Sequence, residues 1–82
     1  MSIEAIKAAL EGARESLLAA HQQVTVARHA VTDAVALLTE LSRDHSESLV
    51  PPQLRLAEER LGTGQAQVTG GIEAIERFGA TL

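Results

Sequence analysis

The chain has 82 residues, a formal net charge of -4 at pH 7, one aromatic residue and no cysteine. Without cysteine it has neither disulfide bonds nor thiolate metal sites, and its acidic balance argues against non-specific binding to nucleic acid or anionic membrane, which needs a basic surface. A chain this short has a marginal core unless another subunit adds to it. We therefore expect one small domain, residues 1–82, that associates with protein.

A first helix is predicted over about residues 2–43, with Ser2 as its N-cap and no proline to interrupt it. Apolar and small residues recur there in a heptad pattern, which places one stripe along one side of a helix, typical of coiled-coil packing. The bulky half of this stripe is Ile3, Leu10, Leu17, Val24, Val31 and Leu38, and the mostly alanine half is Ile6, Ala13, Ala20, Ala27, Ala34 and Leu41.

A polar loop over about residues 44–50 separates this helix from a second one, predicted over about residues 51–80. Pro51 and Pro52 favour a helix start because proline is tolerated in the first turn but not in a helix interior. The second helix repeats the heptad pattern. The sequence thus predicts an all-α fold, an antiparallel two-helix hairpin with a close-packed alanine and glycine seam.

The register follows if Leu41 is placed opposite Leu54. Val24 then faces Gly71 and Val31 faces Gly64, so that in nearly every layer a large residue meets a small one, as close packing requires. Leu17 opposite Phe78 is an exception. The predicted seam of the hairpin is Leu17, Val24, Val31, Leu38, Leu61, Gly64, Val68, Gly71, Ile75 and Phe78.

Four glycines weaken the second helix, each by about 1 kcal/mol relative to alanine. Close approach of the helices explains Gly64 and Gly71 in this register but leaves Gly62 and Gly70 unexplained. The alternative is that the second helix breaks at Gly62–Gly64 or Gly70–Gly71 and that a third, short helix follows.

Two apolar features are left over once the hairpin closes. In the expected register Leu82 reaches only Ala13, so the first turns of the chain overhang. A second stripe of small residues runs beside the seam on the first helix, and such a face favours pairing of two hairpins into a four-helix bundle. The residues predicted to mediate self-association are Ile3, Ile6, Leu10, Ala9, Ala19, Val26 and Ala30.

No catalytic, metal or cofactor site is expected. His21 and His29 are about 12 Å apart along a helix, too far to share one ion. His45 follows Asp44 and precedes Ser46, but neighbours in a turn are not held in the geometry of a catalytic triad. Loop polarity and helix capping explain these residues, and we expect no enzyme.

The length, the two helices and the short polar turn together resemble the WxG-type helical hairpins of type VII secretion systems. The turn reads His45-Ser-Glu-Ser-Leu-Val-Pro-Pro where that family has Trp-x-Gly, and the tail has Phe78 without the Tyr-x-x-x-Asp/Glu export signal. The resemblance implies pairing with a like hairpin.

Two functions remain open from the sequence. The first is a non-catalytic interaction or scaffold module that forms a homodimer or pairs with a paralogous hairpin, associated with type VII secretion. The second is a cytoplasmic antitoxin, immunity protein or chaperone that lays its first helix into a groove of one specific protein partner. No nucleic-acid or membrane partner is expected. Because no signal peptide is recognised, we expect a cytoplasmic protein, with secretion by a signal-peptide-independent route as the alternative.

Overall fold

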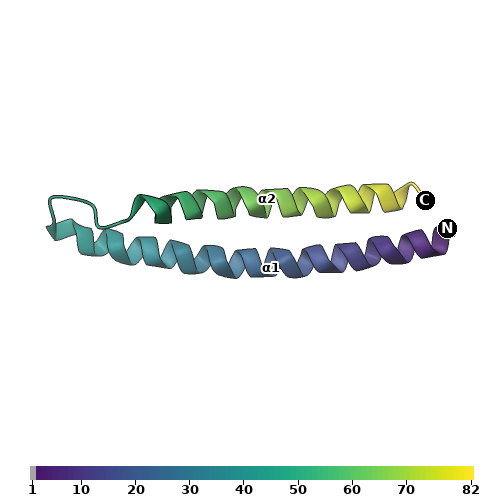
Figure 1. Cartoon of the computed structure of the whole chain (residues 1–82), viewed down its shortest axis with the longest axis horizontal. Coiled ribbons are helices and arrows are strands. Elements are labelled where there is room, and N and C mark those ends of the chain that lie inside the picture. The colour runs from purple at the N-terminus through teal and green to yellow at the C-terminus, as the bar shows by residue number, and fades with distance from the viewer. Residues whose placement is uncertain (1) are drawn as a thin grey trace.

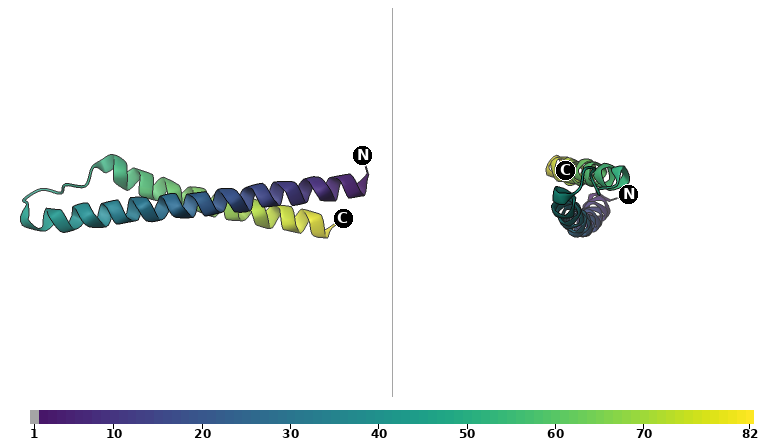
Figure 2. Two further views of the ribbon diagram at one scale, coloured as in Figure 1. Left: turned by 90° about the horizontal axis from the view of Figure 1, so that it is seen from below. Right: turned by 90° about the vertical axis from the view of Figure 1, so that its left-hand side faces the viewer.

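The computed structural model describes residues 2–82 and shows two long helices that lie side by side and run in opposite directions (Figure 1). Helix α1 spans Ile3–Leu41, a short 3-10 turn η1 spans Ser42–Asp44, and α2 spans Pro52–Ala80. The principal extents are 64 × 15 × 15 Å. The predicted all-α antiparallel hairpin is confirmed. A view turned about the long axis shows the helices crossing, so they wind around each other (Figure 2).

The start of α1 follows from its capping residue. Ser2 has an extended backbone, and its hydroxyl accepts a hydrogen bond of 3.1 Å from the backbone N–H of Ala5. Glu4 lies in the first turn, where a negative charge interacts favourably with the helix dipole. The helix ends at Leu41, against an expected end near residue 43, because the chain tightens into η1.

The turn between the helices is organised by Ser42. Its hydroxyl donates to the carbonyl of Leu38 at 2.7 Å and accepts from the backbone N–H of Leu49 at 2.8 Å. Val35 and Val50, with 7% and 9% of their surface exposed, are the buried apolar side chains among residues 2–82. The best-covered part of this thin molecule therefore lies toward its turn.

Helix α2 begins at Pro52, directly after Pro51, which has an extended backbone. It continues without interruption through all four interior glycines to Ala80, and none of the described glycines has a positive φ. The alternative of a break and a third helix is wrong. Packing against α1 holds the glycine backbone in the helical conformation that propensity alone disfavours.

The register differs from the predicted one. A β-carbon added at Gly71 would lie 3.5 Å from Leu17 Cδ1, with no atom of Val24 within 4 Å, and one added at Gly64 would meet nothing within 4 Å. Leu17 was expected opposite Phe78, so α2 is displaced along α1 by about one heptad. Because a shift of seven residues brings every seam residue to another seam position, the same stripe still packs.

The displacement also shortens the predicted overhang. Leu10 Cδ1 lies 4.0 Å from the place of a β-carbon on Gly79, so the last turn of α2 reaches well beyond Ala13. Leu10 and Ile6 are half-buried, whereas Ile3 remains 54% exposed. The expectation that Leu10 has no partner within the hairpin is therefore wrong. Both termini lie at the same end of the molecule, opposite the turn (Figure 1).

No helix within residues 2–82 combines the length and the hydropathy needed to cross a membrane.

Candidate protein-association surface

One flank of the seam carries the polar contacts between the helices. With Val24 taken as heptad position a, Arg14 and Arg28 stand at position e, which borders one edge of the seam. We call this flank the polar side. It comprises Arg14, Thr25, Arg28 and Thr32 of α1 with Gly62, Gln65 and Glu76 of α2.

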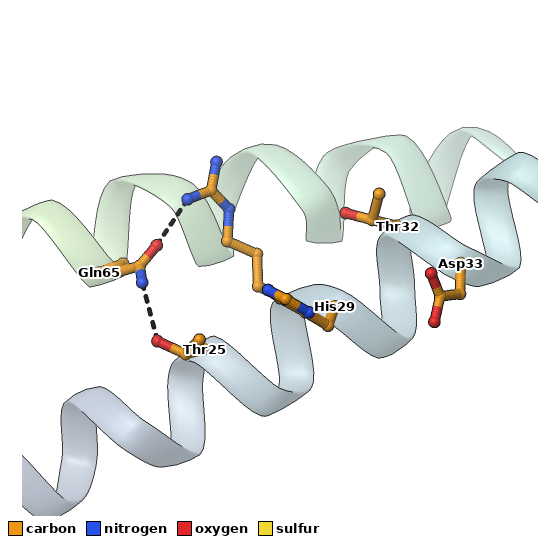
Figure 3. A pocket seen from close by; sticks show the side chains of 6 residues that line it. Thr25, His29, Thr32, Asp33 and Gln65 are labelled. Carbon is orange, nitrogen blue, oxygen red and sulfur yellow. Dashed lines mark hydrogen bonds between the residues drawn. The ribbon is translucent and has the colours of Figure 1, made fainter.

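A hydrogen-bonded chain crosses between the helices on the polar side (Figure 3). The guanidinium of Arg28 donates to Gln65 Oε1, and Gln65 Nε2 donates to Thr25 Oγ1 at 2.9 Å. The Thr25 hydroxyl in turn donates to the carbonyl of His21 at 2.9 Å. These bonds satisfy both ends of the Gln65 amide and link residues far apart in the chain.

Gly62 makes room for this arrangement. A β-carbon there would lie 3.3 Å from Arg28 Nη2, tighter than ordinary contact. This explains a glycine that the heptad pattern leaves without a role. The heptad pattern did not predict the bonds between Arg28, Gln65 and Thr25 because they lie outside the seam, and the unexplained glycine was a signal that pointed to them.

The ion pairs of the polar side are weak and exposed. Arg14 Nε lies 3.5 Å from Glu76 Oε2 across the helices, and Arg14 Nη1 lies 3.7 Å from Glu11 Oε1 within α1. Their side chains are between about one third and two thirds exposed, and pairs of this kind contribute at most about 1 kcal/mol. They orient the helices more than they stabilise them.

A shallow recess of about 290 Å³ lies along this polar chain, between α1 and Gln65 of α2. Figure 3 shows His29, Thr32 and Asp33 of α1, which line the recess. In residues 2–82 no three His, Asp or Glu side chains gather closely enough to hold a metal ion. The recess is an open furrow with mixed polarity.

The opposite flank of the seam is apolar and exposed. Heptad positions c and g border the other edge of the seam, and on α1 they carry mostly small or apolar side chains, with Asp33 and Glu40 as the charged exceptions. We call them the small-residue stripe. It comprises Ala5, Ala9, Gly12, Ser16, Ala19, Gln23, Val26, Ala30 and Leu37, all of them exposed.

Two side chains of this stripe leave large apolar areas in water. Val26 is 71% exposed and Leu37 is 64% exposed. Between the turns of α1 the stripe forms a shallow groove bordered by Ala19, Gln23, Val26 and their neighbours Gln22 and Ala27. On the same flank of α2, Leu56 is exposed and borders a second apolar groove together with Gln53 and Arg60.

The residues predicted for self-association fall into two groups. Ala9, Ala19, Val26 and Ala30 lie on the exposed stripe, whereas Ile3, Ile6 and Leu10 belong to the seam, where Ile3 is exposed and Ile6 and Leu10 are half-buried. The predicted seam residues are half-buried, with one exception. Phe78 is 54% exposed, because the shifted register brings Gly79 instead of Phe78 toward Leu10.

The total accessible surface shows that folding into the hairpin leaves much of the chain exposed to solvent. Its accessible area is 6008 Å², whereas a compact monomer of 8.7 kDa would expose about 4,700 Å². The excess of about 1,300 Å² exceeds the roughly 800 Å² that each partner buries in a standard interface. An extended hairpin with exposed large apolar side chains, Val26 and Leu37 among them, is suited to association with protein.

Comparison with protein-family models, with curated proteins and with solved structures finds no match to this chain.

Proposed function

We propose that this protein is a non-catalytic interaction module, a helical hairpin that associates with itself or with a related hairpin into a four-helix bundle. The observation that carries the proposal is the small-residue stripe, which exposes Val26 and Leu37 on the flank where residues 2–82 show no polar contacts between the helices. Burial of each such side chain contributes about 1.5 to 3 kcal/mol, which is large for a molecule with only two buried apolar residues among those described.

The shape of the stripe supports a helical partner. Alanine, glycine and serine dominate it, so another helix can approach closely along most of the length of α1. Charged side chains are absent from its centre, between Ala9 and Ala30. A partner helix therefore meets no unpaired charge that it would have to bury.

The resemblance to WxG-type hairpins supports the same proposal from the architecture. In that family like hairpins pair, and this chain has the same two-helix form. We propose a role associated with type VII secretion on that basis alone, with pairing as the property to be tested first.

A second candidate uses the same stripe. A regulator that lays α1 into a groove of one specific protein partner would also need a continuous apolar face on a single helix. Here the purified protein remains a monomer until that partner is added, whereas the first candidate forms an oligomer with itself or with a related hairpin.

The test is the molar mass of the purified full chain by light scattering over a wide range of concentration, with helicity followed by circular dichroism. We expect a dimer whose mass falls to that of the monomer in Val26→Asp. Ala36→Asp is the matched control, because Ala36 is an exposed residue of α1 outside the stripe, and it should leave the dimer intact. A fully helical monomer at every concentration, or a Val26→Asp dimer, contradicts self-association through this surface.

A further inference from the structure

We propose that the partner is a second copy of this chain, with the two α1 helices packed antiparallel about a twofold axis near the middle of the helix, so that Val26 of each copy lies over Ser16 of the other. This inference rests on the proposed function and names the occupant and the register of the same surface. The argument starts from the pattern of the small-residue stripe.

The stripe is complementary to itself when it is reversed. In an antiparallel pair, residues at position g of one helix face residues at position c of the other. In the proposed register no two bulky apolar residues face each other, as close packing requires. The facing pairs are Leu37 with Ala5, Asp33 with Ala9, Ala30 with Gly12, Gln23 with Ala19 and Ser16 with Val26. A twofold axis repeats each pair, which is what an isologous interface needs.

The neighbouring registers are worse on the same criteria. A shift of one heptad in one direction sets Val26 against Gln23, two long side chains, and moves Asp33 from Ala9, toward the end of the interface, to Ser16, closer to the axis, where burial of a carboxylate without a partner costs more. A shift in the other direction carries Leu37 past the start of the partner helix. The proposed register also places the axis close to the middle of α1, so the two helices overlap along almost their whole length.

Gly12 supplies a second, independent observation. A glycine inside a helix costs about 1 kcal/mol relative to alanine, and within the hairpin Gly12 has no atom within 4 Å of the place where a β-carbon would stand. Packing inside one chain therefore gives no reason for it. In the dimer it lies opposite Ala30 of the other copy, where two helices with small residues approach most closely.

The surface area is sufficient for such a dimer. The hairpin exposes about 1,300 Å² more than a compact monomer of its mass would, and a standard dimer buries roughly 800 Å² of each partner. The polar side, which carries the cross-helix hydrogen bonds, faces away from the axis and stays in water, so dimerisation does not require those groups to lose their solvent.

Disulfide trapping tests the register, because the chain has no cysteine of its own. Ser16→Cys and Val26→Cys are purified as full chains, and each variant is oxidised alone and in an equal mixture. We expect a covalent dimer in the mixture and little with either variant alone, since two copies of the same residue stand about 15 Å apart along the helices in this arrangement, beyond the reach of a disulfide.

The controls separate the inference from the proposed function. Cross-linking of Val26→Cys with itself indicates a parallel dimer, and cross-linking of a Gln23→Cys and Val26→Cys mixture in preference to Ser16→Cys and Val26→Cys indicates the neighbouring register. Either result, in a protein whose mass is that of a dimer, overturns the proposed arrangement and leaves the association function standing. A chain that is monomeric by mass and forms no cross-link overturns the proposal of a second copy as partner.

Discussion

The guanidinium of Arg28 lies over the backbone of Gly62, and a β-carbon on that glycine would come within 3.3 Å of Arg28 Nη2. The glycine weakens α2 locally, but it leaves room for the guanidinium of Arg28 to approach α2 and donate a hydrogen bond to Gln65. A residue that is unfavourable for the helix by itself thus takes part in setting the position of one helix against the other.

The first prediction compares two glycines of α2. Gly70→Ala should raise the free energy of unfolding by about 0.8 to 1 kcal/mol, the difference in helix propensity, because no atom lies within 4 Å of the new β-carbon. Gly62→Ala should raise the free energy of unfolding by clearly less, because the guanidinium of Arg28 must move away from the new β-carbon. Urea unfolding of both variants measures the difference. Equal increases in the two variants would show that the position of the Arg28 guanidinium beside Gly62 does not affect stability.

The second prediction concerns the bond between Arg28 and Gln65. A double-mutant cycle of Arg28→Ala and Gln65→Ala should give a coupling free energy of about 0.5 kcal/mol, in the range of exposed charged pairs. The same cycle with Gln67→Ala, which lies on the other flank of α2, should give additive effects. Coupling that is no larger for Gln65 than for Gln67 would contradict the role given to this bond.

The third prediction concerns the turn. Ser42→Ala removes a donor to the Leu38 carbonyl and an acceptor for the Leu49 N–H, so it should lower the free energy of unfolding by about 1 to 2 kcal/mol. Ser46→Ala is the control, because no side-chain hydrogen bond of Ser46 is found within residues 2–82. Amide hydrogen exchange at Leu49 should accelerate in the first variant alone.

The fourth prediction separates the hairpin from its assembly. Val35 is buried and Val26 is 71% exposed in the single chain. Val35→Ala should therefore cost about 2 kcal/mol at every protein concentration, from lost burial and the cavity left behind. Val26→Ala should cost little in the dilute monomer and should weaken only the dimer. Thermal melts over a hundredfold concentration range distinguish the two.

The heptad pattern of the sequence was sufficient to predict the hairpin and the approximate ends of its helices, because the spacing of apolar residues defines a stripe and the adjacent prolines mark the start of α2. The same regularity made the register ambiguous. Leu17 lies opposite Gly71 in the structure and opposite Phe78 in the predicted register, one heptad away. Because the heptad repeats, both registers place seam residues opposite seam residues, so the pattern alone does not select one of them.

Arg28, Gly62 and Gln65 come together beside the seam, and a pattern of apolar residues carries no information about them. The stripe around Val26 was identified from the sequence because it repeats with the seam. The exposure of Phe78 was not predicted from the sequence, because it depends on the register of the two helices.

The elongated shape of the hairpin determines how local unfolding propagates along it. In a molecule with extents of 64 × 15 × 15 Å, each helical turn contacts only the adjacent turns of its own helix and the turns opposite it on the other helix. Loss of the contacts of one turn therefore destabilises the neighbouring turns and leaves distant turns unaffected. Local opening should therefore be most frequent at the free ends of the helices and least frequent near the turn, so that amide hydrogen exchange slows along each helix toward the turn.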